Sequence, residues 1–177
     1  MSICRMGNWS KQCEDVLNKQ INMEFYASYS YHALYCYFLR DNVGYIQIAN
    51  YFKKCSDEER EHAEKMMKYQ IRRGGQVKLE PITTPKQEFN DPNIENKDLL
   101  EGFRHALNLE QKVYKNLLSI HSIADSEKDP QFTDFIESEF LNEQIEAINQ
   151  LSVIVNKISK LNLNPHALLY FENTFEP

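Results

Sequence analysis

Glycine, proline and long apolar runs are scarce in this sequence. Its 177 residues include 5 Gly and 6 Pro, too few for a collagen-like or low-complexity chain and for most glycine-rich phosphate-binding loops. No stretch approaches the ~20 consecutive apolar residues of a membrane-spanning helix, so we expect no membrane partner. Because few residues interrupt helices, the composition favours long ones.

Positive charge is also in deficit. Lys and Arg together number 20 against 26 Asp and Glu, which gives a formal net charge of −6 at pH 7. A surface of this sign repels the phosphates of nucleic acids and attracts small cations. We therefore expect no nucleic-acid partner.

The 4 cysteines show no metal-binding spacing. Cys4, Cys13, Cys36 and Cys55 include no Cys-x-x-Cys pair, which indicates free thiols in a reducing compartment. Residues 1–10 contain neither the apolar core of a signal peptide nor an Arg-rich transit segment. From these absences we expect a cytoplasmic location.

Four stretches carry apolar residues at alternating steps of three and four, the periodicity of a helix with one buried face. Each predicted long helix would measure about 43 Å at 1.5 Å per residue. The predicted helices cover about residues 11–40, 45–73, 98–126 and 130–161, with a short fifth helix at 166–173.

The lengths of the connections predict the topology. Short turns after the first and third helices make each of those pairs antiparallel. Residues 75–97 can span a whole helix at about 3.3 Å per residue, so the second and third helices can run parallel. We predict a single all-α domain over residues 1–177, an antiparallel four-helix bundle with one long crossover between the second and third helices.

A polar side chain interrupts each apolar stripe near its middle. The interruptions are Glu24, Glu59 with His62, Glu110 and Gln144 in the four helices in turn, and Tyr31 follows Glu24 on the same face. Mid-helix positions share one layer of a bundle, so these groups should meet inside it. Buried carboxylates are costly to desolvate and repel one another, yet no stripe carries Lys or Arg near its centre.

This donor set is typical of an iron site. Two Fe²⁺ ions would balance three carboxylates, and mostly oxygen donors with one His suit Fe²⁺ better than structural zinc, which prefers four nitrogen or sulfur ligands. Alone, Glu59-x-x-His62 is a weak signal because surface pairs at this spacing are common, and a single buried Glu could simply form an ion pair. The coincidence of four interruptions in one layer favours metal.

Three segments resemble the signatures of the eukaryotic ferritins. They read INMEFYASY at 21–29, EEREHAEK at 58–65, and FIE with LNEQ within 135–144. The resemblance spans about residues 9–162 and implies iron storage in a hollow cage of 24 chains, either alone or co-assembled with other ferritin chains. The complete polar set named above matches the heavy-type, ferroxidase-active chains rather than the light-type chains.

The resemblance also implies roles for these residues. Glu24, Glu59 and His62 would hold one iron, and Glu59 would bridge to a second iron held by Glu110. Gln144 would hydrogen-bond a ligand of the site, and Tyr31 would support it or give up an electron. Each chain would thus oxidise two Fe²⁺ with O₂ and pass the product to a ferric oxyhydroxide mineral inside the cage.

Two further acidic groups match the family. Glu58, Glu61 and Glu64 would assist iron transit and mineral nucleation, although a solvated acidic helix face has the same pattern. Asp134 and Glu137 would line three-fold pores near His121, although acids there could simply complement the helix dipole. The family commonly has Cys where this chain has Thr133, and residues 165–171 depart most from the family.

Two other functions are compatible with such a bundle. Diiron oxygenases and reductase subunits share it, but they usually carry a second Glu-x-x-His. Here Glu110 is followed by Gln-Lys-Val and Glu143 by Gln-Ile-Glu, which favours a ferritin. A cage subunit that only stores iron or co-assembles would not need the full ligand set.

Overall fold

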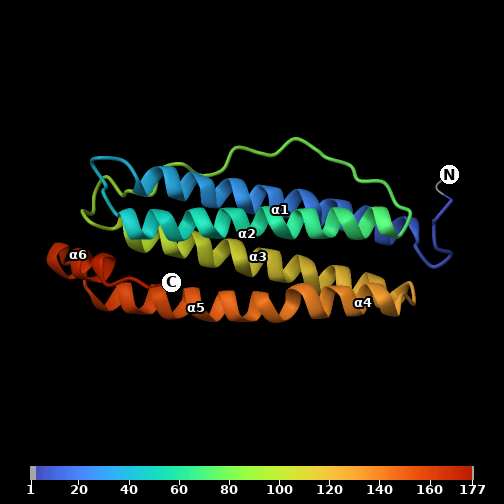
Figure 1. Cartoon of the computed structure of the whole chain (residues 1–177). Helices are drawn as coiled ribbons and strands as arrows, with labels where there is room; N and C mark the ends of the chain where they lie inside the picture. The colour runs from blue at the N-terminus through green and yellow to red at the C-terminus, as the bar shows by residue number, and fades with distance from the viewer. Residues whose placement is uncertain (1–2, 177) are drawn as a thin grey trace.

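Four long helical rods run along the molecule in the computed structural model, which describes residues 3–176 (Figure 1). The elements are α1 (Lys11–Phe38), α2 (Ile46–Arg72), α3 (Asp98–Ser126), α4 (Pro130–Ile136), a π-helical turn η1 (Glu137–Leu141), α5 (Asn142–Lys160) and α6 (Pro165–Asn173). Within residues 3–176 no β-strand forms, and none of the helices is long and apolar enough to cross a membrane. The predicted all-α bundle with a short C-terminal helix is confirmed.

The helix ends follow from local chemistry. Ser10 accepts a hydrogen bond from the Cys13 amide at 3.1 Å, and Asp129 accepts one from the Phe132 amide at 3.0 Å, so each satisfies an amide without a partner in the first turn. Gly74 ends α2 with φ of 79°. A Cβ there would lie 2.4 Å from Arg5 Cα, so only glycine fits this position.

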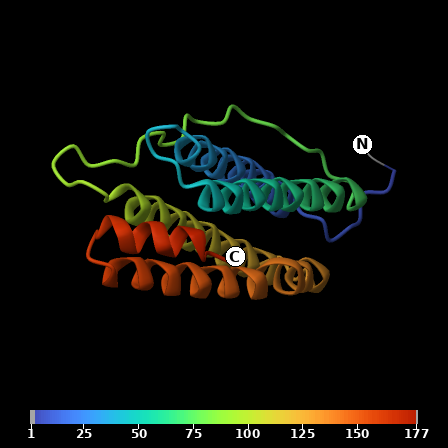
Figure 2. The same cartoon turned by 60° about the vertical axis from the view of Figure 1, so that its left-hand side comes forward.

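The rods alternate in direction as the connections predict. Figure 1 shows α1 and α2 antiparallel, with the chain then returning along the outside of this pair before α3 begins. As a result α3 runs parallel to α2, and the α4–η1–α5 rod runs back beside α3, a pairing that Figure 2 also shows. The one long crossover therefore lies at residues 75–97, as predicted.

Two asparagines of α1 hold this crossover in place. The Asn18 side chain donates to the Gln76 carbonyl and accepts from the Lys78 amide, both at 2.9 Å. One turn later, Asn22 donates to the Lys78 carbonyl at 3.0 Å and accepts from the Glu80 amide at 2.9 Å. The two carboxamides thus satisfy an extended backbone that has no strand partner.

The π-helical turn in the fourth rod was not predicted. Ile136, Phe140 and Gln144 are separated by two consecutive steps of four, whereas a straight α-helix averages 3.6 residues per turn. Two such steps would rotate the last residue away from the core. The wider turn of η1 absorbs the excess, and all three side chains are buried.

The C-terminal helix α6 docks against the beginning of α2. Glu172 is buried and accepts a hydrogen bond from the Gln47 amide at 2.7 Å. Since Tyr45, at the N-cap position of α2, makes no side-chain capping bond, Glu172 supplies a cap from elsewhere in the chain. This segment, where the sequence departs from the ferritins, is therefore packed on the bundle.

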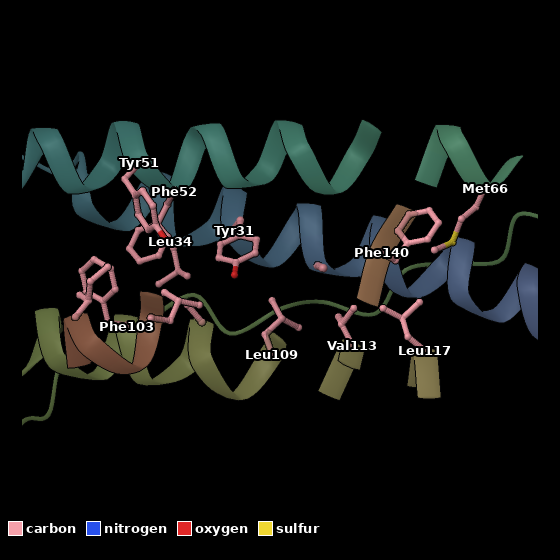
Figure 3. Close-up of a cluster of buried hydrophobic side chains, with 14 of the residues drawn as sticks. Tyr31, Leu34, Tyr51, Phe52, Met66, Phe103, Leu109, Val113, Leu117 and Phe140 are labelled. Atoms are coloured by element: carbon pink, nitrogen blue, oxygen red, sulfur yellow. The ribbon is translucent and has the colours of Figure 1, made fainter. Parts of the chain in front are cut away.

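Apolar layers lie on both sides of the bundle's middle. Figure 3 shows Tyr31 between a group with Phe52 and Phe103 on one side and a group with Met66 and Phe140 on the other. All of these side chains are buried. Dense packing on both sides holds the polar layer between them in one geometry.

We expect Asn18→Leu to loosen the crossover. The substitution removes both hydrogen bonds of Asn18 and should lower the free energy of unfolding by about 1–3 kcal/mol. Thermal unfolding followed by circular dichroism measures the effect as a lower midpoint. Asn50→Leu, at an exposed position of α2, is the matched control, and equal midpoints for the two variants would contradict this role.

Candidate metal centre

The polar side chains predicted to meet in the middle of the bundle do meet there. Glu24 of α1, Glu59 of α2, Glu110 of α3 and Gln144 of α5 are each at most 6% exposed. One side chain from each long rod therefore enters the same buried layer. Among residues 3–176, no Lys or Arg forms an ion pair with any of the three carboxylates.

One half of the centre gathers Glu24, Glu59 and His62. Ligand atoms of the three side chains all lie within 4.8 Å of one another. Gln20 donates to Glu24 Oε1 at 2.8 Å, but Glu24 Oε2 and Glu59 Oε2 are buried and meet no hydrogen-bond donor among the described residues. Buried oxygens without donors are suited to a cation or a shared proton.

The other half of the centre is built on Glu110. Tyr31 donates its hydroxyl hydrogen to Glu110 Oε1, and the Gln144 amide donates to Oε2. Gln144 also donates to the Glu110 backbone carbonyl at 3.2 Å. Tyr31 and Gln144 therefore fix the orientation of this carboxylate, a contact that the sequence did not reveal.

His62 lies at the boundary between the centre and solvent. Its Nδ1 is 3.7 Å from Glu59 Oε2, and its Nε2 is 3.4 Å from Glu143 Oε2. The imidazole packs edge-on against Phe140 with the ring centroids 5.7 Å apart. The ring is thus held with one nitrogen toward the inner carboxylates and the other toward the rim.

Sequence reasoning missed two of these neighbours. Gln20 lies one turn before Glu24, and Glu143 directly precedes Gln144. Their positions relative to Glu24 and Gln144 were visible in the sequence, but neither residue interrupts an apolar stripe. Their roles depend on side-chain reach rather than on helix periodicity.

Burial raises the pKa values of all three carboxyl groups. The pKa of Glu24 lies well above its usual range because of burial and then the charge of Glu59. That of Glu59 is likewise far above normal, from burial and then Glu110. Burial also raises the pKa of Glu110, while hydrogen bonds from Tyr31 and Gln144 oppose the shift. A bound cation must displace these protons, so its affinity falls as pH falls.

A pocket of about 140 Å³ connects this centre with the surface. Glu59, His62 and Glu110 line its inner part, while Glu58 and Glu143 line its exposed part. Since one water occupies about 30 Å³ in the liquid, the pocket has room for ions with several small ligands.

The remaining predicted residues lie outside the centre. Glu58, Glu61 and Glu64 are exposed on α2, and of these only Glu58 lines the pocket. Asp134 of α4 and Glu137, the first residue of η1, are exposed, and Glu137 Oε1 lies 2.5 Å from His121 Nε2. Their pore role would need neighbouring chains and stays a prediction.

The sequence matches the family model for ferritin, described as a ferritin-like domain, over residues 14–161. It is 48% identical over 166 residues to "Ferritin, chloroplastic" of Phaseolus vulgaris, covering 94% of this chain and 64% of that protein. It is also 48% identical over 164 residues to "Ferritin-3, chloroplastic" of Arabidopsis thaliana, covering 93% and 62%. The chain thus spans slightly less than two thirds of the length of these relatives.

The expected cytoplasmic location is contradicted by these relatives, which are named as chloroplastic proteins. The expectation rested on the targeting features that residues 1–10 lack and on a cysteine pattern typical of a reducing compartment. Packing of a helical bundle is the same in any aqueous compartment, so the core offered no independent signal for location.

We expect Glu59→Gln to stabilise the metal-free protein at neutral pH. The folded state raises the pKa of Glu59 above its ordinary value of 4.5, so folding is penalised once the pH exceeds that value. The neutral carboxamide removes the penalty. The thermal midpoint should therefore rise at pH 7, and the gain should shrink as the pH falls toward 4.5.

The control is Glu61→Gln, which changes the same charge at an exposed position of α2. Its midpoint should follow the wild type across this pH range. A lower midpoint for Glu59→Gln at pH 7 would show that the buried carboxylate is not a source of strain.

Proposed function

The chain belongs to the ferritin family, and we propose that it oxidises Fe²⁺ with O₂ and retains the product as ferric oxyhydroxide. The observation that carries this proposal is the buried pair Glu24 and Glu59 next to His62, because each has an oxygen that meets no donor within residues 3–176. A layer with three carboxylates that no Lys or Arg of the described residues neutralises is suited to a cationic substrate.

The donor positions support two iron sites per chain. Glu24, Glu59 and His62 would hold one Fe²⁺, since their ligand atoms already converge. Glu59 and Glu110 would hold the second, and Tyr31 and Gln144 would orient Glu110 through the hydrogen bonds they donate. Each Fe²⁺ gives up one electron, so a pair reduces O₂ by two electrons.

The charge of the centre favours the oxidised product. Carboxylates are hard anionic donors, and Coulomb attraction to them grows with the charge of the cation. They therefore stabilise Fe³⁺ more than Fe²⁺, which promotes electron loss. This supports a ferroxidase rather than a passive storage subunit.

The proposed path of iron uses the exposed acidic residues. Ferric product would leave through the pocket past Glu58 and Glu143, which line it. Glu61 and Glu64, exposed further along α2, would then assist transit and nucleation of the mineral. Asp134 and Glu137 would guide Fe²⁺ into the cage by electrostatic focusing.

We further propose assembly into a cage of 24 identical chains, with a mass of about 500 kDa from 20.9 kDa each. The single chain leaves large apolar side chains exposed, such as Tyr29, Leu79, Ile82 and Tyr170, as expected of surfaces that neighbours cover. The names of the relatives favour a plastid as its location.

We expect Glu59→Lys to abolish fast iron oxidation. The ammonium group would replace a metal-binding carboxylate and pair with Glu24 and Glu110, so cations would be excluded while the fold survives. Stopped-flow absorbance of ferric species in air measures the loss. Glu61→Lys, with the same charge change on the exposed face of α2, should retain the fast phase, and a fast phase in Glu59→Lys would place the oxidation elsewhere.

Replacing both Asp134 and Glu137 by Ala should slow iron uptake by the intact cage. The exposed carboxylates would no longer raise the local Fe²⁺ concentration, an effect that reaches about tenfold or more in charged clefts. Uptake at low salt measures the change, and native mass measurement verifies assembly. Equal uptake by wild type and the double variant would mean that iron enters by another route.

A further inference from the structure

We propose that Lys54 limits the affinity of the iron pocket for cations and speeds the departure of ferric product from its exposed end. This inference rests on the proposed function and assigns a regulatory role to a residue outside the predicted metal ligands. Lys54 would act through its charge, without contacting iron.

The position of Lys54 carries the proposal. Lys54 lines the pocket together with Glu58 and Glu143, and among the described residues that line it no other Lys or Arg occurs. Its Nζ lies 3.8 Å from Glu58 Oε1, and its side chain is 67% exposed. The ammonium therefore lies at the exposed end of the pocket, next to the Glu58 carboxylate.

The positive charge of Lys54 determines its effect on cation binding. Glu58 and Glu143 attract a cation at the exposed end, and Lys54 opposes this attraction. The opposition is greater for Fe³⁺ than for Fe²⁺, because Coulomb repulsion scales with the charge of the ion. Lys54 would therefore weaken the binding of Fe²⁺ moderately and shorten the time for which Fe³⁺ stays bound to the outer carboxylates.

A simpler role for Lys54 is an ordinary ion pair with Glu58, one helical turn away. Such a pair stabilises an exposed helix slightly and does not alter metal affinity. The two roles differ in their dependence on charge and on salt. Metal binding by variants of Lys54 therefore separates them.

The experiment measures Zn²⁺ binding to the assembled metal-free protein by calorimetry, since Zn²⁺ undergoes no oxidation. Sites are assigned to the pocket when they are absent from Glu59→Lys. Relative to wild type, Lys54→Gln should bind Zn²⁺ about threefold more tightly and Lys54→Glu about tenfold more tightly at physiological salt. Lys54→Arg, which retains the charge, should match the wild type.

The control for net charge is Lys68→Glu. Lys68 is exposed on α2 and lies 14 residues beyond Lys54, about 21 Å along the helix and beyond the Debye length at physiological salt. Its substitution should leave the affinity of the pocket unchanged. The gain in Lys54→Glu should also shrink toward ~0.5 M salt, where charges are screened over a few ångströms.

A second measurement follows release of the ferric product. After a single addition of Fe²⁺ in air, the spectrum of the centre should return to its starting state more slowly in Lys54→Glu than in wild type. Equal Zn²⁺ affinity for wild type, Lys54→Gln and Lys54→Glu would overturn the inference alone. A wild type that binds no more Zn²⁺ than Glu59→Lys would overturn the proposed function as well.

Discussion

The burial of three carboxyl groups in one layer of an apolar bundle is the constraint on which this structure depends. Glu24, Glu59 and Glu110 are buried without a Lys or Arg partner among the described residues. In the metal-free protein this arrangement destabilises the folded state. Burial and mutual repulsion raise the pKa values of the three carboxyl groups, so folding makes them retain protons that they would release in water at neutral pH. The same features attract cations, so the cost to stability and the proposed affinity for iron have one physical cause.

The rest of the bundle holds these carboxylates together. Figure 3 shows apolar side chains packed on both sides of Tyr31. These layers prevent the carboxyl side chains from moving toward water. The π-helical turn brings Phe140 and Gln144 to the same interior face, where one packs against His62 and the other holds Glu110. Outside the centre, Glu58 and Glu143 attract cations while Lys54 opposes them, so charge also controls the proposed exchange with solvent.

The long helices and their ends were predictable because their causes are local in sequence. Apolar steps of three and four determine a helix and its buried face. Gly74 at the end of α2 and Asp129 before α4 act through their own backbone and nearest turns. The meeting of Glu24, Glu59, Glu110 and Gln144 was also predictable, because mid-helix positions share a layer whichever way the helices run.

The sequence by itself therefore determined the helical bundle, its buried polar layer and the resemblance to the ferritins. Only the tertiary structure decided which side chains of that layer contact one another. Tyr31 and Gln144 donate to Glu110, and Glu143 approaches His62, across gaps between helices that no periodicity describes. The hydrogen bonds of Asn18 to the crossover have the same origin. Such contacts depend on the spacing and rotation of packed helices, which the complete set of side chains fixes together.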